Sequence, residues 1–241
     1  MAGILYVVST PIGNPEDLTF RALRILREVH WIAAENSQVT KRLLDHYSVQ
    51  TPITTYHALN AEEKAPVLTA RLLNGQSGAL VSDTGTPVLF DPGLLLISHA
   101  VASHVRVVPV PGPSAPLAAA SGSGLLSEAL IIHGYFPTRS QVRRRLLESL
   151  RAEPRTSVLL IQSSGLRQTL ERLQPILGRR RLALAKNLTM PDEEFLRGTA
   201  ADLLDQVRRR PIEGELTLVI EGKKGGPKER GQSERFRITT R

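Results

Sequence analysis

The sequence predicts an α/β protein made of two domains, and two patterns support this prediction. Short apolar runs rich in β-branched residues recur along the chain, and segments with the 3.6-residue period of a helix separate them. Strands that are apolar throughout and alternate with helices favour parallel pairing in a sheet covered on both faces. The length of 241 residues fits one large domain or two small ones, at ~100–200 residues per domain.

Five strands are expected in the first half of the chain. The apolar runs that predict them are Ile4–Val8, Trp31–Ala34, Ile53–Tyr56, Ala79–Ser82 and Val105–Val110. Helical periodicity lies between them, in the series Leu18, Ala22, Ile25, Leu26 and Val29 and in the series Ala65, Leu68 and Leu72. Residues 1–114 are therefore expected to form an N-terminal domain with a mostly parallel sheet.

A second set of elements follows a stretch of prolines and small residues at 111–124, whose alanines could open a helix. Strands are expected at Ala129–His133, Ser157–Ile161, Leu182–Lys186 and Leu216–Ile220. An apolar stripe of leucines predicts a helix between two of them, with Leu166, Leu170, Leu173 and Leu177 at helical spacing. Residues 115–222 are expected to form the C-terminal domain, followed by a mobile basic tail over 223–241.

Composition excludes several classes of protein. Hydrophobic residues make up 41% and charged residues 22% of the chain, as in an average soluble globule. The absence of cysteine excludes disulfides, Cys-ligated metal centres and a thiol nucleophile. No window approaches the ~18 consecutive apolar residues of a membrane span. The N-terminal sequence lacks the features of a secretion signal, so a cytoplasmic protein is expected.

Positive charge is concentrated at the end of the chain. The 31 Lys and Arg against 23 Asp and Glu give a formal net charge of +8. Residues 223–241 contain seven Lys and Arg against two Glu, and arginine triplets occur at 143–145, 179–181 and 208–210. A basic tail and arginine clusters favour a phosphate-rich partner. The triplets can equally be solvated helix ends, where cations complement the helix dipole.

Three loops at expected strand carboxyl ends are rich in glycine, proline and small hydroxyl residues. They read STPIGN at 9–14, SDTGTP at 82–87 continuing to DPG at 91–93, and PGPSA at 111–115. Ligands of open parallel sheets bind outside the carboxyl ends of the strands, and such loops offer mainly backbone groups to a polar ligand. The glycine fingerprints of dinucleotide-binding proteins and P-loop NTPases are absent.

These loops resemble a known family. LYVVSTPIGNPEDLTFRAL, SDTGTPVLFDPG, VVPVPGPSA and a closing EGELTLVIEG are similar, in order and spacing, to motifs of the tetrapyrrole-methylase-like methyltransferases. The nearest branch methylates the ribose 2′-hydroxyl of a cytidine in bacterial small-subunit (16S) ribosomal RNA. The resemblance implies a mostly parallel N-terminal sheet, a mixed C-terminal sheet and S-adenosylmethionine in a cleft between the two domains. It also implies a homodimer, with small-subunit ribosomal RNA or the 30S subunit as partner.

The resemblance also implies which residues hold the cofactor. By position they are Thr10, Pro11, Ile12, Gly13, Ser82, Asp83, Thr84, Gly85, Pro87, Ser114, Ala115, Gly214 and Glu215. Glu35, just past an expected strand end, is the candidate base or hydroxyl-orienting group, and His57 is a weaker candidate. A carboxylate near a hydroxyl can accept its proton. The histidines have no metal-ligand spacing, so no metal site is expected.

Several family motifs are altered, mostly where the family has charged residues. Asn36 and Gln38 stand where the family has an acid and an arginine, and changes also affect 56–61, 161–167 and 186–190. An amide cannot act as a general base. This leaves two alternatives to the ribosomal RNA methyltransferase. One is a catalytically weakened RNA- or ribosome-binding paralogue, and the other is a methyltransferase of a porphyrinoid or another small molecule.

Overall fold

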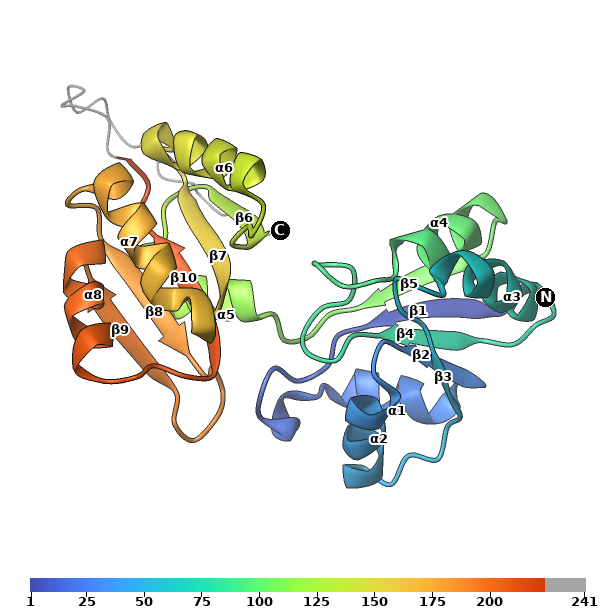
Figure 1. The fold of residues 1–241 in the computed structure, drawn as a ribbon. Coiled ribbons are helices and arrows are strands. Elements are labelled where there is room, and N and C mark those ends of the chain that lie inside the picture. Colours follow the sequence, from blue (N-terminus) through green and yellow to red (C-terminus); the bar gives the residue numbers. More distant parts are fainter. Residues whose placement is uncertain (224–241) are drawn as a thin grey trace, which may run out of the picture.

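The computed structural model describes residues 1–223, which form two α/β domains side by side (Figure 1). The basic tail expected over 223–241 lies outside the described residues except for Lys223. Each domain contains one five-stranded sheet, and the chain completes the first sheet before it begins the second. The expected fold class is confirmed: an α/β protein with a parallel N-terminal sheet and a mixed C-terminal sheet.

The N-terminal sheet is entirely parallel. Its order is β3-β2-β4-β1-β5, with the strands β1 (Ile4–Val8), β2 (Trp31–Ala34), β3 (Ile53–Thr55), β4 (Gly78–Val81) and β5 (Arg106–Val110). All five were expected, and the observed ends differ from the expected ones by at most one residue. In a parallel sheet every strand ends at the same edge, so the loops after these strands lie along one edge.

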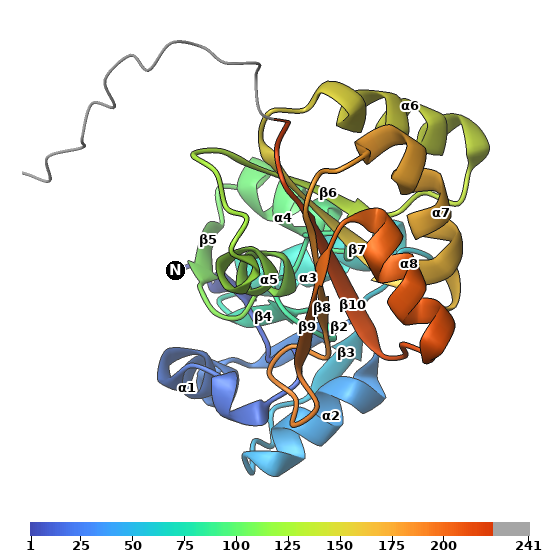
Figure 2. The same cartoon turned by 90° about the vertical axis from the view of Figure 1, so that its left-hand side faces the viewer.

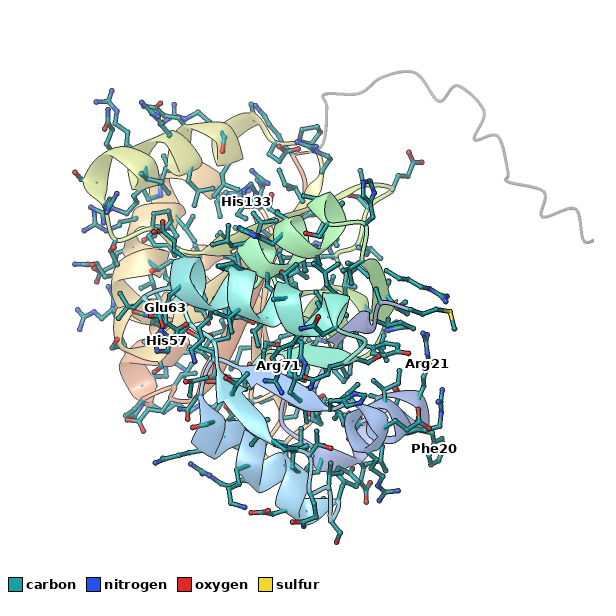
Figure 3. The ribbon with its side chains drawn as sticks, turned by 90° about the vertical axis from the view of Figure 1, so that its right-hand side faces the viewer. Phe20, Arg21, His57, Glu63, Arg71 and His133 are labelled. Atoms are coloured by element: carbon teal, nitrogen blue, oxygen red, sulfur yellow. The ribbon has the colours of Figure 1, made fainter. Side chains whose placement is uncertain are left out.

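Helices cover both faces of this sheet, as apolar parallel strands require. One face carries α1 (Phe20–Glu28) and α2 (Ser37–His46), and the other carries α3 (Ala61–Leu73) and α4 (Leu94–Ala102). A single 3₁₀ turn, η1 (Pro15–Asp17), precedes α1. The expected stripes are the buried ones: Ala22, Ile25 and Leu26 of α1 and Ala65, Leu68 and Leu72 of α3. Figure 3 shows Phe20, the first residue of α1, at the surface, and Arg71 of α3, whose guanidinium lies 5.5 Å from the Trp31 ring centroid.

The C-terminal sheet is mixed. Its order is β6-β7-β10-β8-β9, with β6 (Leu130–Tyr135), β7 (Thr156–Gln162), β8 (Leu182–Lys186), β9 (Glu194–Gly198) and β10 (Glu215–Ile220). The pair β6–β7 is parallel and the other three pairs are antiparallel. Strand β9 was not expected. It is an edge strand with the sequence EFLRG, so it lacks the continuous apolar run by which the other strands are recognised.

Helices also cover both faces of the C-terminal sheet (Figure 2). One face packs against α6 (Ser140–Ala152), α7 (Leu166–Leu177) and α8 (Ala200–Arg209), with a 3₁₀ turn η2 (Ser163–Gly165) before α7. The other face packs against α5 (Ala115–Ser123), the helix that the alanines of the linking stretch suggested. Because α5 packs on β7, β8 and β10, it belongs with the second sheet. The division at 114/115 remains a prediction that agrees with this packing.

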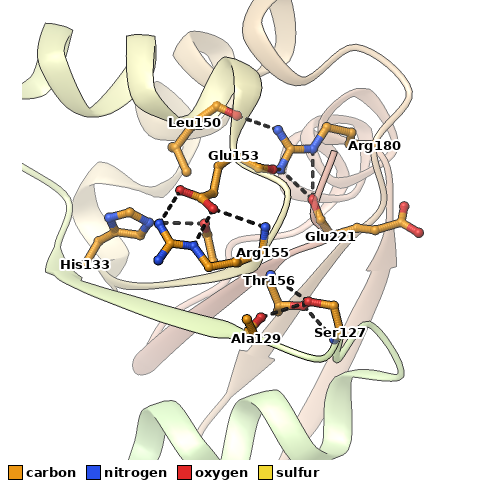
Figure 4. A network of polar contacts seen from close by, with 10 residues as sticks. Ser127, Ala129, His133, Leu150, Glu153, Arg155, Thr156, Arg180 and Glu221 are labelled. Atoms are coloured by element: carbon orange, nitrogen blue, oxygen red, sulfur yellow. Dashed lines mark hydrogen bonds and ion pairs between the residues drawn. The ribbon is translucent and has the colours of Figure 1, made fainter. Parts of the chain in front are cut away.

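Arg180 is part of the internal structure of the C-terminal domain (Figure 4). Its guanidinium donates hydrogen bonds to the main-chain oxygens of Leu150, Glu153 and Glu221, and so ties the end of α6 to the end of β10. The neighbouring Glu153 carboxylate accepts from Arg155, which lowers the pKa of Glu153 to about 2. Part of the positive charge of this domain is thus structural.

The first loop of the N-terminal domain reaches into the second domain. Ile12 is buried in the same apolar cluster as Leu188 and the alanines of α5. The backbone N–H of Asn14 donates to Thr189 Oγ1 at 2.9 Å. Gly13 allows a close approach here, since a Cβ there would lie 2.7 Å from the Leu188 carbonyl oxygen. The two domains therefore meet where the predicted cofactor loop lies.

Candidate active site

The loops after β1, β4 and β5 are joined to one another by hydrogen bonds. Thr10 and Gly85 exchange backbone hydrogen bonds of 2.9 and 3.1 Å, which form an isolated antiparallel bridge between the first two loops. Ser82 Oγ donates to the Gly85 carbonyl oxygen at 3.0 Å, and Thr86 Oγ1 donates to the Pro113 oxygen of the third loop at 3.1 Å. Short polar side chains thus fix the three loops without using any charge.

A cleft opens between these loops and the C-terminal sheet. The N-terminal side contributes Ile12, Thr84, Gly85, Thr86, Leu89, Phe90, Asp91 and Ser114, and the C-terminal side contributes Ala115, Pro116, Tyr135, Leu160, Ile161, Glu215, Leu216 and Thr217. It encloses about 90 Å³, which is less than the ~300–1,000 Å³ of typical small-molecule sites. A ligand of nucleoside size therefore requires the walls to move apart.

Ser114 carries the clearest sign that this cleft holds a ligand. Its side chain is 8% exposed and lines the cleft. It precedes α5 at the N-cap position, where a serine usually caps the helix, yet its hydroxyl makes no cap hydrogen bond. Ser114 Oγ has no hydrogen-bond partner in residues 1–223. Buried polar atoms are almost always paired, so a polar ligand in the cleft would complete this site.

Three carboxylates from the N-terminal domain gather beside the cleft. Burial, followed by the Glu35 and Asp83 carboxylates, raises the pKa of Asp91 to about 6, against the opposing effect of a hydrogen bond from Ser82. Burial also raises the pKa of Glu35, as does Asp83, while His57 acts against them. Asp91 is the one of these three that lines the cleft itself. A carboxyl group that titrates near pH 6 is suited to general base catalysis.

The C-terminal domain adds Tyr135 and Glu215 to the same electrostatic cluster. Burial raises the pKa of the Tyr135 hydroxyl, and the carboxylates of Glu215, Asp91 and Glu35 add to this shift. Tyr135 ends β6 and Glu215 begins β10, so both belong to the second sheet. The cleft therefore collects negative charge from both domains, which suits a cationic ligand group.

The predicted cofactor residues fall into two groups. Lining the cleft are Ile12, Thr84, Gly85, Ser114, Ala115 and Glu215. Behind them lie Thr10, Pro11, Gly13, Ser82, Asp83, Pro87 and Gly214, which shape the loops or contact other residues. Asp83 Oδ1 accepts from the backbone N–H of Asn36 at 3.0 Å, and Gly214 lies against the Asn187 side chain, where a Cβ would clash. Glu35 is half-buried beside the cleft and does not line it.

Sequence reasoning missed several lining residues. Asp91 is the first residue of the quoted DPG sequence, and its position near the end of the motif SDTGTPVLFDPG was the available signal. Phe90 lies in the quoted SDTGTPVLFDPG sequence but was not selected from it, and Tyr135 had no motif to mark it. Leu160, Leu216 and Thr217 lie within strands of the C-terminal sheet, and a strand sequence does not reveal which end faces a cleft.

Asn36 has a structural role in the place where the family has an acid. Its side-chain oxygen accepts from the backbone N–H groups of Gln38 and Val39 at the start of α2. Asn and Asp are about equally good N-caps. The replacement thus preserves the cap, and its chemistry gives no reason to expect a lost catalytic group at this position.

Residues 1–223 hold no group of three or more His, Asp or Glu side chains placed to bind a metal ion. None of their helices has the length and apolar character needed to cross a membrane.

The fold and the cleft together define a two-domain α/β protein whose cleft lies at the carboxyl ends of parallel strands, where proteins of this architecture bind their ligands. The chain belongs to the family described as tetrapyrrole (corrin/porphyrin) methylases, whose model matches residues 4–204, and it is a methyltransferase.

Its curated relatives include proteins named ribosomal RNA small subunit methyltransferase I. The one from Halalkalibacterium halodurans is 40% identical over 220 residues, which cover 91% of this chain and 76% of the relative. The one from Xylella fastidiosa is 42% identical over 223 residues, which cover 91% and 82%. The resemblance inferred from the loop motifs is confirmed.

Solved structures show the same fold at low identity. A cobalt precorrin-4 methyltransferase has a TM-score of 0.71 at 20% identity and covers 90% of this chain and 94% of its own. A Thermus thermophilus uroporphyrin-III C-methyltransferase in complex with S-adenosyl homocysteine has a TM-score of 0.63 at 18% identity, covering 91% and 97%. At these identities the likeness concerns the fold.

Proposed function

We propose that this protein transfers the methyl group of S-adenosylmethionine to the ribose 2′-hydroxyl of a cytidine in small-subunit ribosomal RNA. The observation that supports this most is the cleft itself. It unites the family's glycine- and proline-rich loops with an unpaired buried hydroxyl, Ser114 Oγ, in a chain about 40% identical to small-subunit ribosomal RNA methyltransferases.

The residues of the cleft suit this cofactor. The sulfonium centre of S-adenosylmethionine, when bound, supplies a methyl group that is already activated for transfer. Asp91 and Glu215 line the cleft and place negative charge where a sulfonium cation is stabilised. Ser114 Oγ and the main chain around Gly85 provide uncharged hydrogen-bonding groups for the polar parts of the cofactor.

The remaining task of the protein is to orient the ribose hydroxyl and to remove its proton. Asp91 is the carboxylate best placed for this step, since it lines the cleft and its raised pKa, about 6, leaves it ionised and basic at neutral pH. After burial, the charge of the Glu35 carboxylate also raises the pKa of Asp91. Holding the reacting groups in line contributes ~7–11 kcal/mol in favourable cases, so positioning carries much of the catalysis.

The narrow cleft adds a conformational requirement. Leu89 and Phe90 form part of its wall, and Phe90 packs so closely on β6 that a Cβ at Gly134 would lie 2.3 Å from its ring. Entry of a nucleoside cofactor requires this contact between the domains to loosen. The segment also holds Val88 at φ +74° and Phe90 at φ +78°, conformations that cost non-glycine residues energy and occur preferentially at functional sites.

The proposal includes a cytoplasmic homodimer. Large apolar side chains remain exposed on three helices, among them Val67 of α3, Leu94 and Val101 of α4 and Leu117 of α5. Exposed apolar surface of this kind is typical of protein–protein contacts. Sedimentation equilibrium should give the mass of two chains, and a monomer at micromolar concentration would contradict this part.

Two measurements test the main proposal. Isothermal titration of S-adenosylmethionine into the purified chain should give saturable heat. Incubation with labelled cofactor and 30S subunits from a deletion strain should label one cytidine, mapped by resistance of its 3′ phosphodiester to alkaline cleavage. Cofactor binding without transfer to the subunit would instead favour the catalytically weakened paralogue.

A further inference from the structure

Arginines are unevenly distributed over the helices of the C-terminal domain. Residues 139–152, which comprise α6 and the residue before it, contain five arginines and one acidic residue, Glu148. Residues 200–210, which comprise α8 and the residue after it, contain three arginines and two aspartates. Helix α6 is therefore the most strongly positive helix of this domain. It runs along the outside of the C-terminal domain above β6 and β7 (Figure 1).

The arginines of α6 are also the least neutralised. Arg144 pairs with Glu148 at 2.8 Å, with both side chains largely exposed, and such a surface pair is worth little. Arg139 and Arg145 are exposed and have no acidic partner among residues 1–223. In the other two triplets Arg181, Arg208 and Arg210 pair with acids and Arg180 is bound to carbonyl oxygens, so that each keeps one arginine without a partner in the described residues. Residues 139–152 keep three, because Arg151 is exposed and unpaired as well.

A hollow lies beside the first turn of α6. It encloses about 420 Å³, within the ~300–1,000 Å³ typical of small-ligand sites. Its walls include the rings of Tyr135 and Phe136, the amides of Gln162 and Gln168, and Arg143. Arg143 is held in place by a 2.7 Å hydrogen bond to the Thr138 oxygen. Aromatic faces that stack on bases and amides that bind base edges are the groups with which proteins recognise unpaired nucleotides.

The hollow and the cofactor cleft are neighbours. Tyr135, which is 53% exposed, lines both. Ile161 lines the cleft, and the next residue, Gln162, lines the hollow. The local charge is negative at the cleft, where carboxylates lie, and positive at α6, where arginines lie. A polyanion is repelled by the first and attracted by the second, so its phosphates belong on α6 while one nucleoside enters the cleft.

We propose that the RNA substrate lies on the C-terminal domain, with its phosphates on the exposed arginines of α6 and one unpaired nucleotide beside the methylated one in the hollow. This inference rests on the proposed function for the identity of the substrate. It adds the surface that holds the RNA and the single-stranded form in which the RNA is bound.

The first test measures the phosphate contacts with a fluorescent oligocytidylate of about 12 nucleotides and the full chain. R144Q/R145Q should weaken binding about tenfold near 0.1 M KCl. It should also lower the slope of log Kd against log[KCl] by about 1.4, at ~0.7 per lost phosphate contact on single strands. R208Q/R209Q is the matched control, since Arg208 also pairs with a nearby acid, and it should change Kd less than twofold. The basic tail is present in every variant and cancels in the comparison.

The second test concerns the hollow. Gln168 and Gln174 are both exposed on α7, but only Gln168 lines the hollow. Q168A should weaken oligonucleotide binding about fivefold with an unchanged salt slope, because no charge is removed, and Q174A should have no effect. Equal losses from both arginine pairs, equal losses from both glutamines, or no measurable binding by the wild type would overturn the inference.

The proposed function is tested separately by titration with S-adenosylmethionine, which none of these variants should alter. If the cofactor binds and the α6 pair has no effect on RNA, the surface is wrong and the function stands. If the cofactor fails to bind while the α6 pair still weakens RNA binding, the function is wrong and the surface stands.

Discussion

The two sheets present their loops to the shared cleft in different ways. The N-terminal sheet contributes loops tied together by backbone and hydroxyl hydrogen bonds, with Asp91, Glu35 and Asp83 as their acidic groups. The C-terminal sheet contributes the half-exposed Tyr135 at the end of β6. The arginines lie on α6, the helix that follows β6 in the chain.

This difference corresponds to two kinds of ligand. Rigid loops with fixed main-chain groups suit a small cofactor, and carboxylates suit its positive sulfonium. A long helix that carries arginines and has an aromatic residue near its N-terminus suits a flexible polyanion. Under the proposed function, the N-terminal half binds the methyl donor and the C-terminal half binds the acceptor.

The largest expected effect belongs to Asp91. D91N should lower kcat by about 10²–10⁴-fold, the usual contribution of a general base, and should also weaken cofactor binding, because Asp91 supplies part of the negative charge of the cleft. The wild-type rate should rise with pH through about 6 and then level off, because the ionised carboxylate is the base. E35Q is the comparison, since Glu35 does not line the cleft, and it should cost less than D91N. A larger loss of kcat in E35Q than in D91N would identify Glu35 as the base.

D91N should also change how the free energy of unfolding depends on pH. The folded-state pKa of Asp91, about 6, lies above the unfolded value of ~3.9, so the folded protein binds more protons between these pH values. Wild-type stability therefore falls as pH rises from about 4 to 6. D91N lacks this loss and should be more stable than wild type at pH 7.5 by about 1 kcal/mol after allowance for solvent screening. The gain should disappear near pH 4 in urea titrations, whereas a structural carboxylate would give a loss.

The next effect separates structural from free arginines in the C-terminal domain. R180A removes a guanidinium that binds three carbonyl oxygens and should lower the free energy of unfolding by about 3–4 kcal/mol. R179A changes the exposed neighbour, which makes no hydrogen bond or ion pair within the described residues, and should have an effect below about 0.5 kcal/mol. Chemical denaturation measures both. Similar losses would mean that the triplet acts through its overall charge.

Much of the fold could be predicted because the strongest signals are local. Buried parallel strands are continuous apolar runs, and nine of the ten strands were predicted in this way. Strand β9 was missed because it lies at an edge, carries Glu194 and Arg197, and packs mainly through Leu196. Its position depends on pairing with β8 and on packing against α8, which are contacts distant in sequence from its own residues.

The candidate site could likewise be predicted from the sequence only in part. Loop composition located the N-terminal wall, because glycine and proline mark places where backbone must approach a ligand. It could not distinguish lining residues from supporting ones, since Thr10, Ser82 and Thr84 are all small hydroxyl residues, and only the fold buries the first two and leaves Thr84 exposed. Tyr135 and Thr217 line the cleft because of the way the second sheet packs, and no local pattern encodes that packing.

A smaller effect tests the contact between the two domains. Gly134 and Gly124 have similar positive φ angles, +80° and +72°, but a Cβ at Gly134 meets the Phe90 ring and one at Gly124 meets nothing within 4 Å. G124A should cost about 1 kcal/mol from backbone strain, and G134A should cost about 1–2 kcal/mol more from overpacking. That excess should disappear in an F90A background, as measured by a double-mutant cycle. An unchanged excess would mean that Phe90 does not pack on β6 in solution.

The smallest expected effect is the most specific to the cofactor, and it compares the two serines at the ends of α5. Ser114 Oγ has no partner in the described chain, whereas Ser123 Oγ donates to the Ala120 oxygen at 2.7 Å and accepts from the Leu125 N–H at 3.0 Å. S114A should leave stability unchanged and raise the Kd for S-adenosylmethionine about fivefold, the effect of one hydrogen bond of ~1 kcal/mol. S123A should show the reverse, a stability loss of about 1–2 kcal/mol with unchanged affinity. Calorimetric titration and urea denaturation of the same samples separate the two outcomes. If S114A destabilised the fold and left affinity unchanged, the unpaired hydroxyl would belong to the protein's own packing, and the main support for the N-terminal half as the cofactor site would be lost.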